Sequence, residues 1–172
     1  IIIKTAELIK SSKKPLILLG AGANRKEARR AISNFINQTK IPFCNTQMGK
    51  GSVDESSDYF LGTAALSDKD YLHDYIGAAD LIINIGHDVV EKPPFFMEHG
   101  GALVIHINYK SAQVDQVYFP QVEVIGDIAL SMDALADCFD LATGFKLEEF
   151  YQVRDLVRNM TTASLEEISF PP

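Results

Sequence analysis

The stretch that decides the fold is Pro15-Leu16-Ile17-Leu18-Leu19-Gly20-Ala21-Gly22-Ala23-Asn24. Its apolar run predicts a buried strand, and the two glycines that follow predict a tight turn. A segment with helical periodicity comes next, from Arg25 to Gln38. Strand, glycine turn and helix in this order are typical of the opening of a parallel α/β unit.

The glycine turn has two interpretations, which the sequence leaves open. Glycine lets the backbone turn sharply and approach another group closely, which a purely structural turn also needs. Free N–H groups at the start of the following helix could instead hold an anion. The dinucleotide-binding pattern asks for a third glycine, and this chain has Arg25 at that place.

The composition is that of an ordinary globular protein, with 172 residues, 47% apolar and 23% charged. The net charge of −7 argues against a nucleic-acid or anionic-membrane partner, because phosphate binding needs clustered Lys and Arg. No apolar run approaches the roughly 20 residues of a membrane span. The only cysteines, Cys44 and Cys138, lie far apart, which favours a reducing, cytoplasmic location. Because the chain begins with Ile1 and no Met, we expect it to be a piece of a longer protein.

Apolar residues recur at helical spacing in two early segments. In the first segment they are Ile2, Ile3, Ala6 and Ile9. In the second they are Ala28, Ala31, Ile32, Phe35 and Ile36. Further helices are expected at 68–77 and 128–141, and a charged helical segment at 145–159, with an extended end at 169–172.

Apolar runs at 41–46, 80–86, 103–108 and 122–126 predict further strands, and they are continuous rather than alternating. Such runs indicate a parallel sheet covered on both faces. We therefore predict a three-layer, Rossmann-like α/β domain with five or six parallel strands and helices on both faces. Gly20, Gly22, Gly49 and Gly86 follow three of these strands, so we expect them to converge on one crevice at the carboxyl edge.

The order of these segments carries a resemblance to a known family over about residues 2–140. The matching stretches are Lys14-Pro15 to Gly22, Ile41-Pro42-Phe43 before Met48-Gly49-Lys50-Gly51, Tyr59-Phe60-Leu61-Gly62, Ala78 to Gly86, Val104 to Asn108, and Gly126-Asp127. The chain resembles the central domain of thiamine-diphosphate-dependent enzymes of the acetolactate synthase and pyruvate oxidase family. Gly86-His87-Asp88-Val89-Val90-Glu91, followed by Pro93 and Phe95-Phe96, resembles most the catabolic, flavin-independent acetolactate synthases.

The resemblance implies a three-domain enzyme that decarboxylates a 2-oxo acid such as pyruvate and joins it to a second. The first domain would supply an activating carboxylate, and a Gly-Asp-Gly…Asn stretch in the third would hold Mg²⁺ and thiamine diphosphate. This chain has no Gly-Asp-Gly, so we expect no catalytic or metal-ligating residue in it and no activity of the chain alone. Residues 1–143 would be the central domain and 144–172 a helical segment and linker, in a homodimer or tetramer.

In flavin-containing relatives the central domain holds the ADP half of FAD. The candidate cofactor-binding residues here are Gly20, Ala21, Gly22, Met48, Gly49, Gly62, Gly86, His87, Asp88, Asn108 and Asp127. The flavin enzymes usually carry an Arg and paired Asp where this chain has His87-Asp88-Val89-Val90, and an Asp near Asn108-Tyr109-Lys110. Without that carboxylate a ribose loses its usual acceptor, which argues against FAD and predicts a formed but vacant crevice.

Two other functions remain open alternatives: an FAD-, NAD- or ADP-binding module with a redox or regulatory role, and a pure interaction domain. A sirtuin is excluded because it needs four zinc cysteines. We expect His106 to be a hydrogen-bonded core histidine and His87 a polar loop residue. Cys44 is expected to be a small buried apolar residue.

Overall fold

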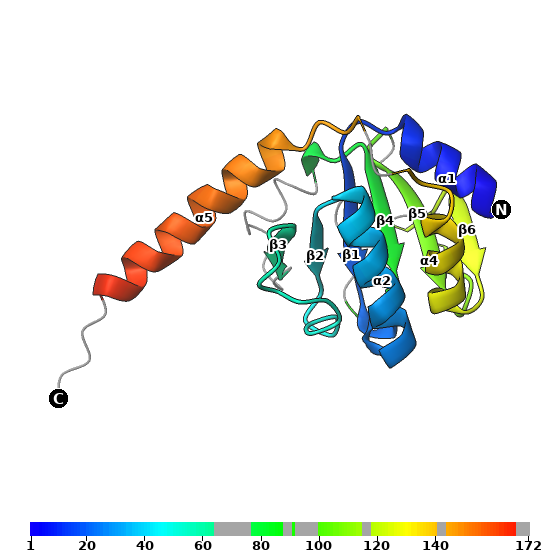
Figure 1. Cartoon of the computed structure of the whole chain (residues 1–172), viewed down its shortest axis with the longest axis horizontal. Helices are drawn as coiled ribbons and strands as arrows, with labels where there is room; N and C mark the ends of the chain where they lie inside the picture. The colour runs from blue at the N-terminus through cyan, green and yellow to red at the C-terminus, as the bar shows by residue number, and fades with distance from the viewer. Residues whose placement is uncertain (64–76, 88–90, 92–99, 115–117, 141–143, 168–172) are drawn as a thin grey trace.

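The computed structural model describes residues 1–63, 77–87, 91, 100–114, 118–140 and 144–167. Six strands form one parallel sheet in the order β3-β2-β1-β4-β5-β6 (Figure 1). The strands are β1 (Pro15–Leu19), β2 (Phe43–Asn45), β3 (Phe60–Thr63), β4 (Leu81–Ile85), β5 (Leu103–Asn108) and β6 (Val122–Ile125). The predicted α/β class and parallel sheet are confirmed.

The strand order reverses between β1 and β4. From β1 the chain builds outward through β2 to the edge strand β3, and then returns to place β4 on the other side of β1. Every residue of β1 and β4 is buried, as expected for central strands covered on both faces. Leu19 is paired with Ile85, so the two strands end side by side at the point where ligands bind in open α/β sheets.

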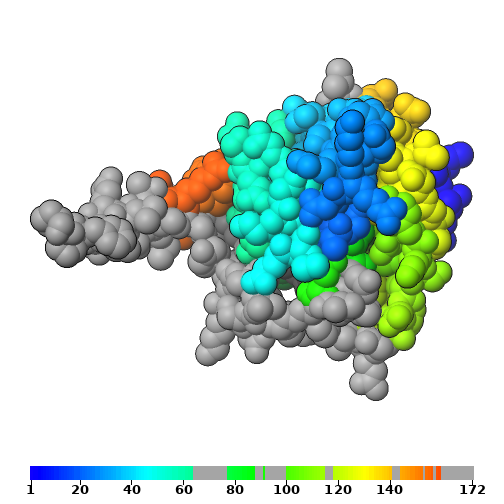
Figure 2. All heavy atoms as spheres, turned by 90° about the horizontal axis from the view of Figure 1, so that it is seen from below, coloured from blue at the N-terminus to red at the C-terminus, as the bar shows by residue number. Residues whose placement is uncertain are grey.

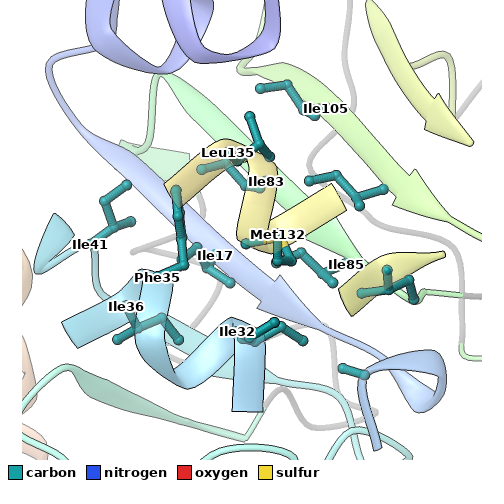
Figure 3. Close-up of a cluster of buried hydrophobic side chains, with 14 of the residues drawn as sticks. Ile17, Ile32, Phe35, Ile36, Ile41, Ile83, Ile85, Ile105, Met132 and Leu135 are labelled. Carbon is teal, nitrogen blue, oxygen red and sulfur yellow. The ribbon is translucent and has the colours of Figure 1, made fainter. Parts of the chain in front are cut away.

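One face of the sheet is covered by α1 (Ile2–Ser11), α2 (Lys26–Thr39) and α4 (Ile128–Ala136). Figure 3 shows side chains from α2 and α4 meeting those of β1, β4 and β5. The labelled members of this cluster are Ile17, Ile32, Phe35, Ile36, Ile41, Ile83, Ile85, Ile105, Met132 and Leu135. The five apolar positions predicted for α2 are all buried.

The start of α5 (Glu148–Glu167) packs on the opposite face, where Phe150 joins Leu16, Leu18 and Ile82 in a second cluster. Polar contacts also anchor its start: Lys14 pairs with Glu149, and the Tyr151 hydroxyl donates to the Lys40 carbonyl at 3.0 Å. Arg154 and Arg158 donate to the carbonyls of Asp58 and Ser57 just before β3, and beyond these contacts α5 extends away from the sheet (Figure 1). The helix is longer than the 145–159 predicted from its periodicity.

The structure corrects several details of the prediction. Ile3 is 71% exposed, because the buried stripe of α1 runs through Thr5, Ala6 and Ile9. β3 is a strand that its mixed polar and apolar sequence did not indicate. α4 ends at Ala136 rather than 141, and a tighter turn then carries Phe139 back into the core.

Some predicted features lie outside the described residues. The helix predicted at 68–77 is one of them, apart from its end at Gly77. The extended end at 169–172 is another.

Candidate site at the carboxyl edge of the sheet

Four glycines meet where β1, β2 and β4 end. A Cβ atom added to Gly20 would lie 2.5 Å from the Cα of His87, and one added to Gly22 would lie 2.9 Å from the Cα of Gly86. A Cβ on Gly49 would overlap the Leu19 carbonyl oxygen. Gly86 also has a φ of +67°, which side chains rarely adopt. Close approach of backbone to backbone therefore accounts for each glycine without a ligand.

The backbone N–H groups of this turn all have acceptors within the chain. Gly20 donates to the Ile85 carbonyl at 2.9 Å, Gly22 to the Gly86 carbonyl at 2.8 Å, and Ala23 to the Gly20 carbonyl at 3.0 Å. The remaining N–H, that of Ala21, donates to Oε1 of Glu91 at 2.9 Å. A phosphate at the turn would find no unpaired donor among these four groups.

The turn also does not lead directly into the next helix. The short 3-10 helix η1 (Ala21–Asn24) intervenes, and α2 begins only at Lys26. The helix predicted from Arg25 to Gln38 is present, shifted by one residue, and η1 is the additional element that the sequence did not indicate. The positive end of the α2 dipole lies one turn further along the chain.

Glu91 is the residue that sequence reasoning missed. Its second carboxylate oxygen accepts a hydrogen bond from the Thr46 hydroxyl, and Thr46 directly follows β2. The side chain therefore links the β1 turn to the end of β2. Its position in the Gly86-to-Glu91 stretch, which carries the family resemblance, could have indicated a role for Glu91, but the spacing alone does not show what this side chain contacts.

A cavity of about 300 Å³ lies beside the turn, at the carboxyl ends of β1, β4 and β5. Figure 2 shows this edge of the molecule, with α2 in blue. The residues that line the cavity are Ala21, Gly22, Arg25, Gly86, His87, His106, Asn108, Tyr109, Lys110, Ser111, Ala112, Gln113 and Tyr118. Five of the eleven predicted site residues line the cavity, namely Ala21, Gly22, Gly86, His87 and Asn108. Gly20 does not line it but packs against His87, which does.

A buried chain of hydrogen bonds runs beneath the cavity. Nε2 of His106 lies 2.9 Å from the Lys110 carbonyl, so this nitrogen carries the proton and Nδ1 is the acceptor. The Tyr118 hydroxyl, 2.8 Å from Nδ1, donates to it and accepts from Nδ2 of Asn84 at 2.7 Å. Burial raises the pKa of Tyr118, which keeps its hydroxyl protonated. His106 is thus the hydrogen-bonded core histidine that the sequence predicted.

The described rim of the cavity carries positive charge. The Arg25 guanidinium lies 4.2 Å from the ring centroid of Tyr109, and Lys110 is exposed beside it. Asn108 donates from Nδ2 to the His87 carbonyl at 2.8 Å, so this amide joins two loops. No Asp or Glu is among the lining residues that the structure describes. The described part of the site therefore does not fit the ribose of FAD in the usual way, because none of its residues supplies the acidic acceptor.

Four other candidate residues are described and do not line the cavity. Met48 is 62% exposed, Gly62 sits in β3 opposite Cys44, and the Asp127 carboxylate caps α4 by accepting from the Leu130 N–H at 3.0 Å. Gly49 packs under the turn. Asp88 lies outside the described residues.

Neither cysteine chemistry nor metal binding is indicated by the described part of the chain. Cys44 is buried, and burial raises the pKa of its thiol to about 12, so it is the apolar residue that was predicted. Within the described ranges, no group of three or more His, Cys, Asp or Glu side chains is placed to hold a metal ion. No helix among them is long and apolar enough to cross a membrane.

A doubly wound parallel sheet with a glycine turn at its switch point defines a broad class of nucleotide-binding and related folds. Within it, residues 2–135 match the family model described as "Thiamine pyrophosphate enzyme, central domain". The chain belongs to this family. A solved structure of a thiamin diphosphate-dependent enzyme from Mycobacterium smegmatis has the same fold, with a TM-score of 0.67 and 19% identity over 81% of this chain and 27% of that one.

Curated relatives include two acetolactate synthases. The catabolic enzyme of Raoultella terrigena is 33% identical over 76% of this chain, and the large subunit of Pyropia yezoensis is 32% identical over 74%. A trihydroxycyclohexane-1,2-dione hydrolase of Clostridium tetani is 30% identical over 76%. The matched segment spans 24%, 22% and 20% of these relatives, so the chain corresponds to about a fifth to a quarter of their length.

Proposed function

We propose that this chain is the central domain of an acetolactate synthase-like, thiamine-diphosphate-dependent enzyme. The intact protein would decarboxylate a 2-oxo acid such as pyruvate and join the product to a second 2-oxo acid. In this reaction the central domain positions the catalytic domains and binds no nucleotide. The observation that supports this role is the glycine turn, whose four N–H groups are all satisfied within the chain.

The partners in this proposal are the neighbouring domains of the same chain, which would hold thiamine diphosphate and Mg²⁺. Residues 144–172 would form the connection toward the third domain, with α5 anchored on the sheet through Phe150 and Tyr151. A cytoplasmic homodimer or tetramer is the assembly that the family resemblance favours.

The alternative is a nucleotide-binding module with a redox or regulatory role. The cavity at the switch point favours it, because Arg25 and Lys110 could attract a phosphate. Stoichiometric binding of FAD, ADP or NAD at nanomolar affinity would support this alternative over an architectural role.

Acetolactate formation tests the first proposal. Purified chain, supplied with pyruvate, thiamine diphosphate and Mg²⁺, should give no product above a control without protein. The intact gene product, assayed in the same way, should form acetolactate. Turnover by the chain alone, or no turnover of any 2-oxo acid by the intact protein, would contradict the proposal.

A further inference from the structure

We propose that the Glu91 carboxylate is a resident anion of the glycine turn and excludes diphosphate groups from the neighbouring cavity. This inference rests on the proposed function, since it gives the reason why the nucleotide site is closed. It concerns a class of ligand: inorganic pyrophosphate and nucleoside diphosphates. Glu91 would then determine specificity by excluding a class of ligand.

The position of the carboxylate is that of an anion bound to a glycine turn. Oε1 of Glu91 accepts from the Ala21 N–H at 2.9 Å. The same oxygen would lie 2.8 Å from a Cβ on Gly20, so it occupies the space that the missing side chain leaves open. Close approach of an anion to the backbone at this place is what such glycines permit.

Two segments hold the carboxylate in place. The Ala21 N–H comes from the turn after β1, and the hydroxyl that donates to Oε2 comes from Thr46 after β2. Hydrogen bonds to an ionised carboxylate are stronger than neutral ones. A diphosphate entering here would meet a negative charge and would have to displace both bonds.

The cavity would attract an anion if this charge were removed. Arg25 and Lys110 lie on its rim, and its described lining residues include no carboxylate. Since no acidic side chain is among the described lining residues to bind a ribose, the Glu91→Ala variant should gain affinity for the phosphates alone. ADP and inorganic pyrophosphate should therefore gain affinity by similar factors.

The test is a calorimetric titration of inorganic pyrophosphate and ADP into the chain and its variants. Glu91→Ala frees the Ala21 N–H and removes the charge, and should tighten binding of both ligands about tenfold or more. Glu91→Gln keeps an acceptor for that N–H and should gain less. Glu55→Gln is the control matched to Glu91→Gln, because Glu55 also accepts from a glycine-turn N–H, that of Gly51 at 2.9 Å, whereas Glu91 accepts from Ala21, which lines the cavity. It should bind like the unmodified chain.

A folded Glu91→Ala variant with unchanged affinity overturns the proposal, as does an equal gain in Glu55→Gln. If Glu91→Ala does not fold, Thr46→Val is the second variant, because it removes only the hydroxyl that donates to the Glu91 carboxylate. Thr46→Val should still tighten pyrophosphate binding several-fold, and unchanged affinity in this variant overturns the proposal. Hydrogen exchange on the unmodified chain gives an independent reading, since the Ala21 amide should be protected. Fast exchange at Ala21 also overturns it.

The same titrations separate this inference from the proposed function. Weak binding by the unmodified chain with no gain in the variants rejects the role of Glu91 alone. Nanomolar binding of ADP by the unmodified chain rejects the closed site itself, and the architectural role with it.

Discussion

The N–H of Gly22 donates to the carbonyl of Gly86 at 2.8 Å, across the point where the strand order reverses. This contact joins the ends of β1 and β4 so closely that neither residue has room for a side chain. The glycines of the turn thus lock two central strands together. A phosphate-binding loop of the same sequence pattern would leave its N–H groups free.

Gly86→Ala should destabilise the chain strongly. The substitution combines a φ of +67° with a Cβ placed 2.5 Å from the Ala23 nitrogen, and we expect a loss of about 2–4 kcal/mol in the free energy of unfolding. Gly51→Ala is the control, because Gly51 has a φ of +75° with no atom within 4 Å of the added Cβ. It should cost only the backbone strain, about 1–2 kcal/mol. Urea denaturation measures both, and equal losses would show that close packing at Gly86 adds nothing.

Tyr118→Phe should cost more than the removal of one ordinary hydroxyl. It leaves Nδ2 of Asn84 without its acceptor and Nδ1 of His106 without its donor, both in buried surroundings. We expect a loss of about 2–3 kcal/mol. Tyr151→Phe removes a single exposed hydrogen bond to Lys40 and should cost about 1 kcal/mol or less. Equal effects in thermal or urea unfolding would contradict the hydrogen-bond chain proposed for Asn84, Tyr118 and His106.

Asp80 should make the stability depend on pH in the acid range. Burial alone would raise the pKa of its carboxyl, but hydrogen bonds from Ser12 and from the Lys13 and Lys14 N–H groups outweigh it and lower the pKa. A carboxyl whose pKa is lower in the folded state stabilises the fold above its unfolded pKa, about 3.9. That contribution is lost as the pH falls through the folded value.

Asp80→Asn should therefore flatten the pH dependence of unfolding below about pH 4. Because the carboxylate is exposed, the effect should be about 1 kcal/mol or less. Asp155→Asn, at an exposed residue paired with the adjacent Arg154, is the control. If the free energy of unfolding of Asp80→Asn falls at acid pH as steeply as that of the unmodified chain, the hydrogen bonds around this carboxylate do not stabilise the fold.

The sequence predicted the parts of the fold that local pattern determines. The strands β1 and β4 were visible because a strand buried on both faces leaves a continuous apolar run. The helix α2 was visible because a helix buried on one face leaves an apolar stripe with a period of about 3.6 residues. The edge strand β3 could not be predicted in this way, since it is short, half-buried and interrupted by Gly62. Ile3 was misplaced because it lies just outside a stripe that includes the polar Thr5.

The convergence of the glycine turns was predicted from the sequence, but the contacts around them were not. Parallel strands bring their carboxyl ends together, so the convergence of Gly20, Gly22 and Gly86 follows from topology. The side chain that fills the space beside these glycines does not follow from topology. The contact between Glu91 and Ala21 joins residues 70 positions apart, and no local pattern indicates it. Asp127 likewise matched a ligand position by sequence, whereas its carboxylate caps α4.

The measurement that tests this account most directly is a calorimetric titration of the unmodified chain with ADP, FAD and NAD. A glycine turn whose N–H groups are already paired, beside a cavity whose described lining includes no carboxylate, predicts no binding tighter than about 10 μM, or about −7 kcal/mol. Stoichiometric binding of any of the three at nanomolar affinity would contradict the account, and would make this central domain a working nucleotide site.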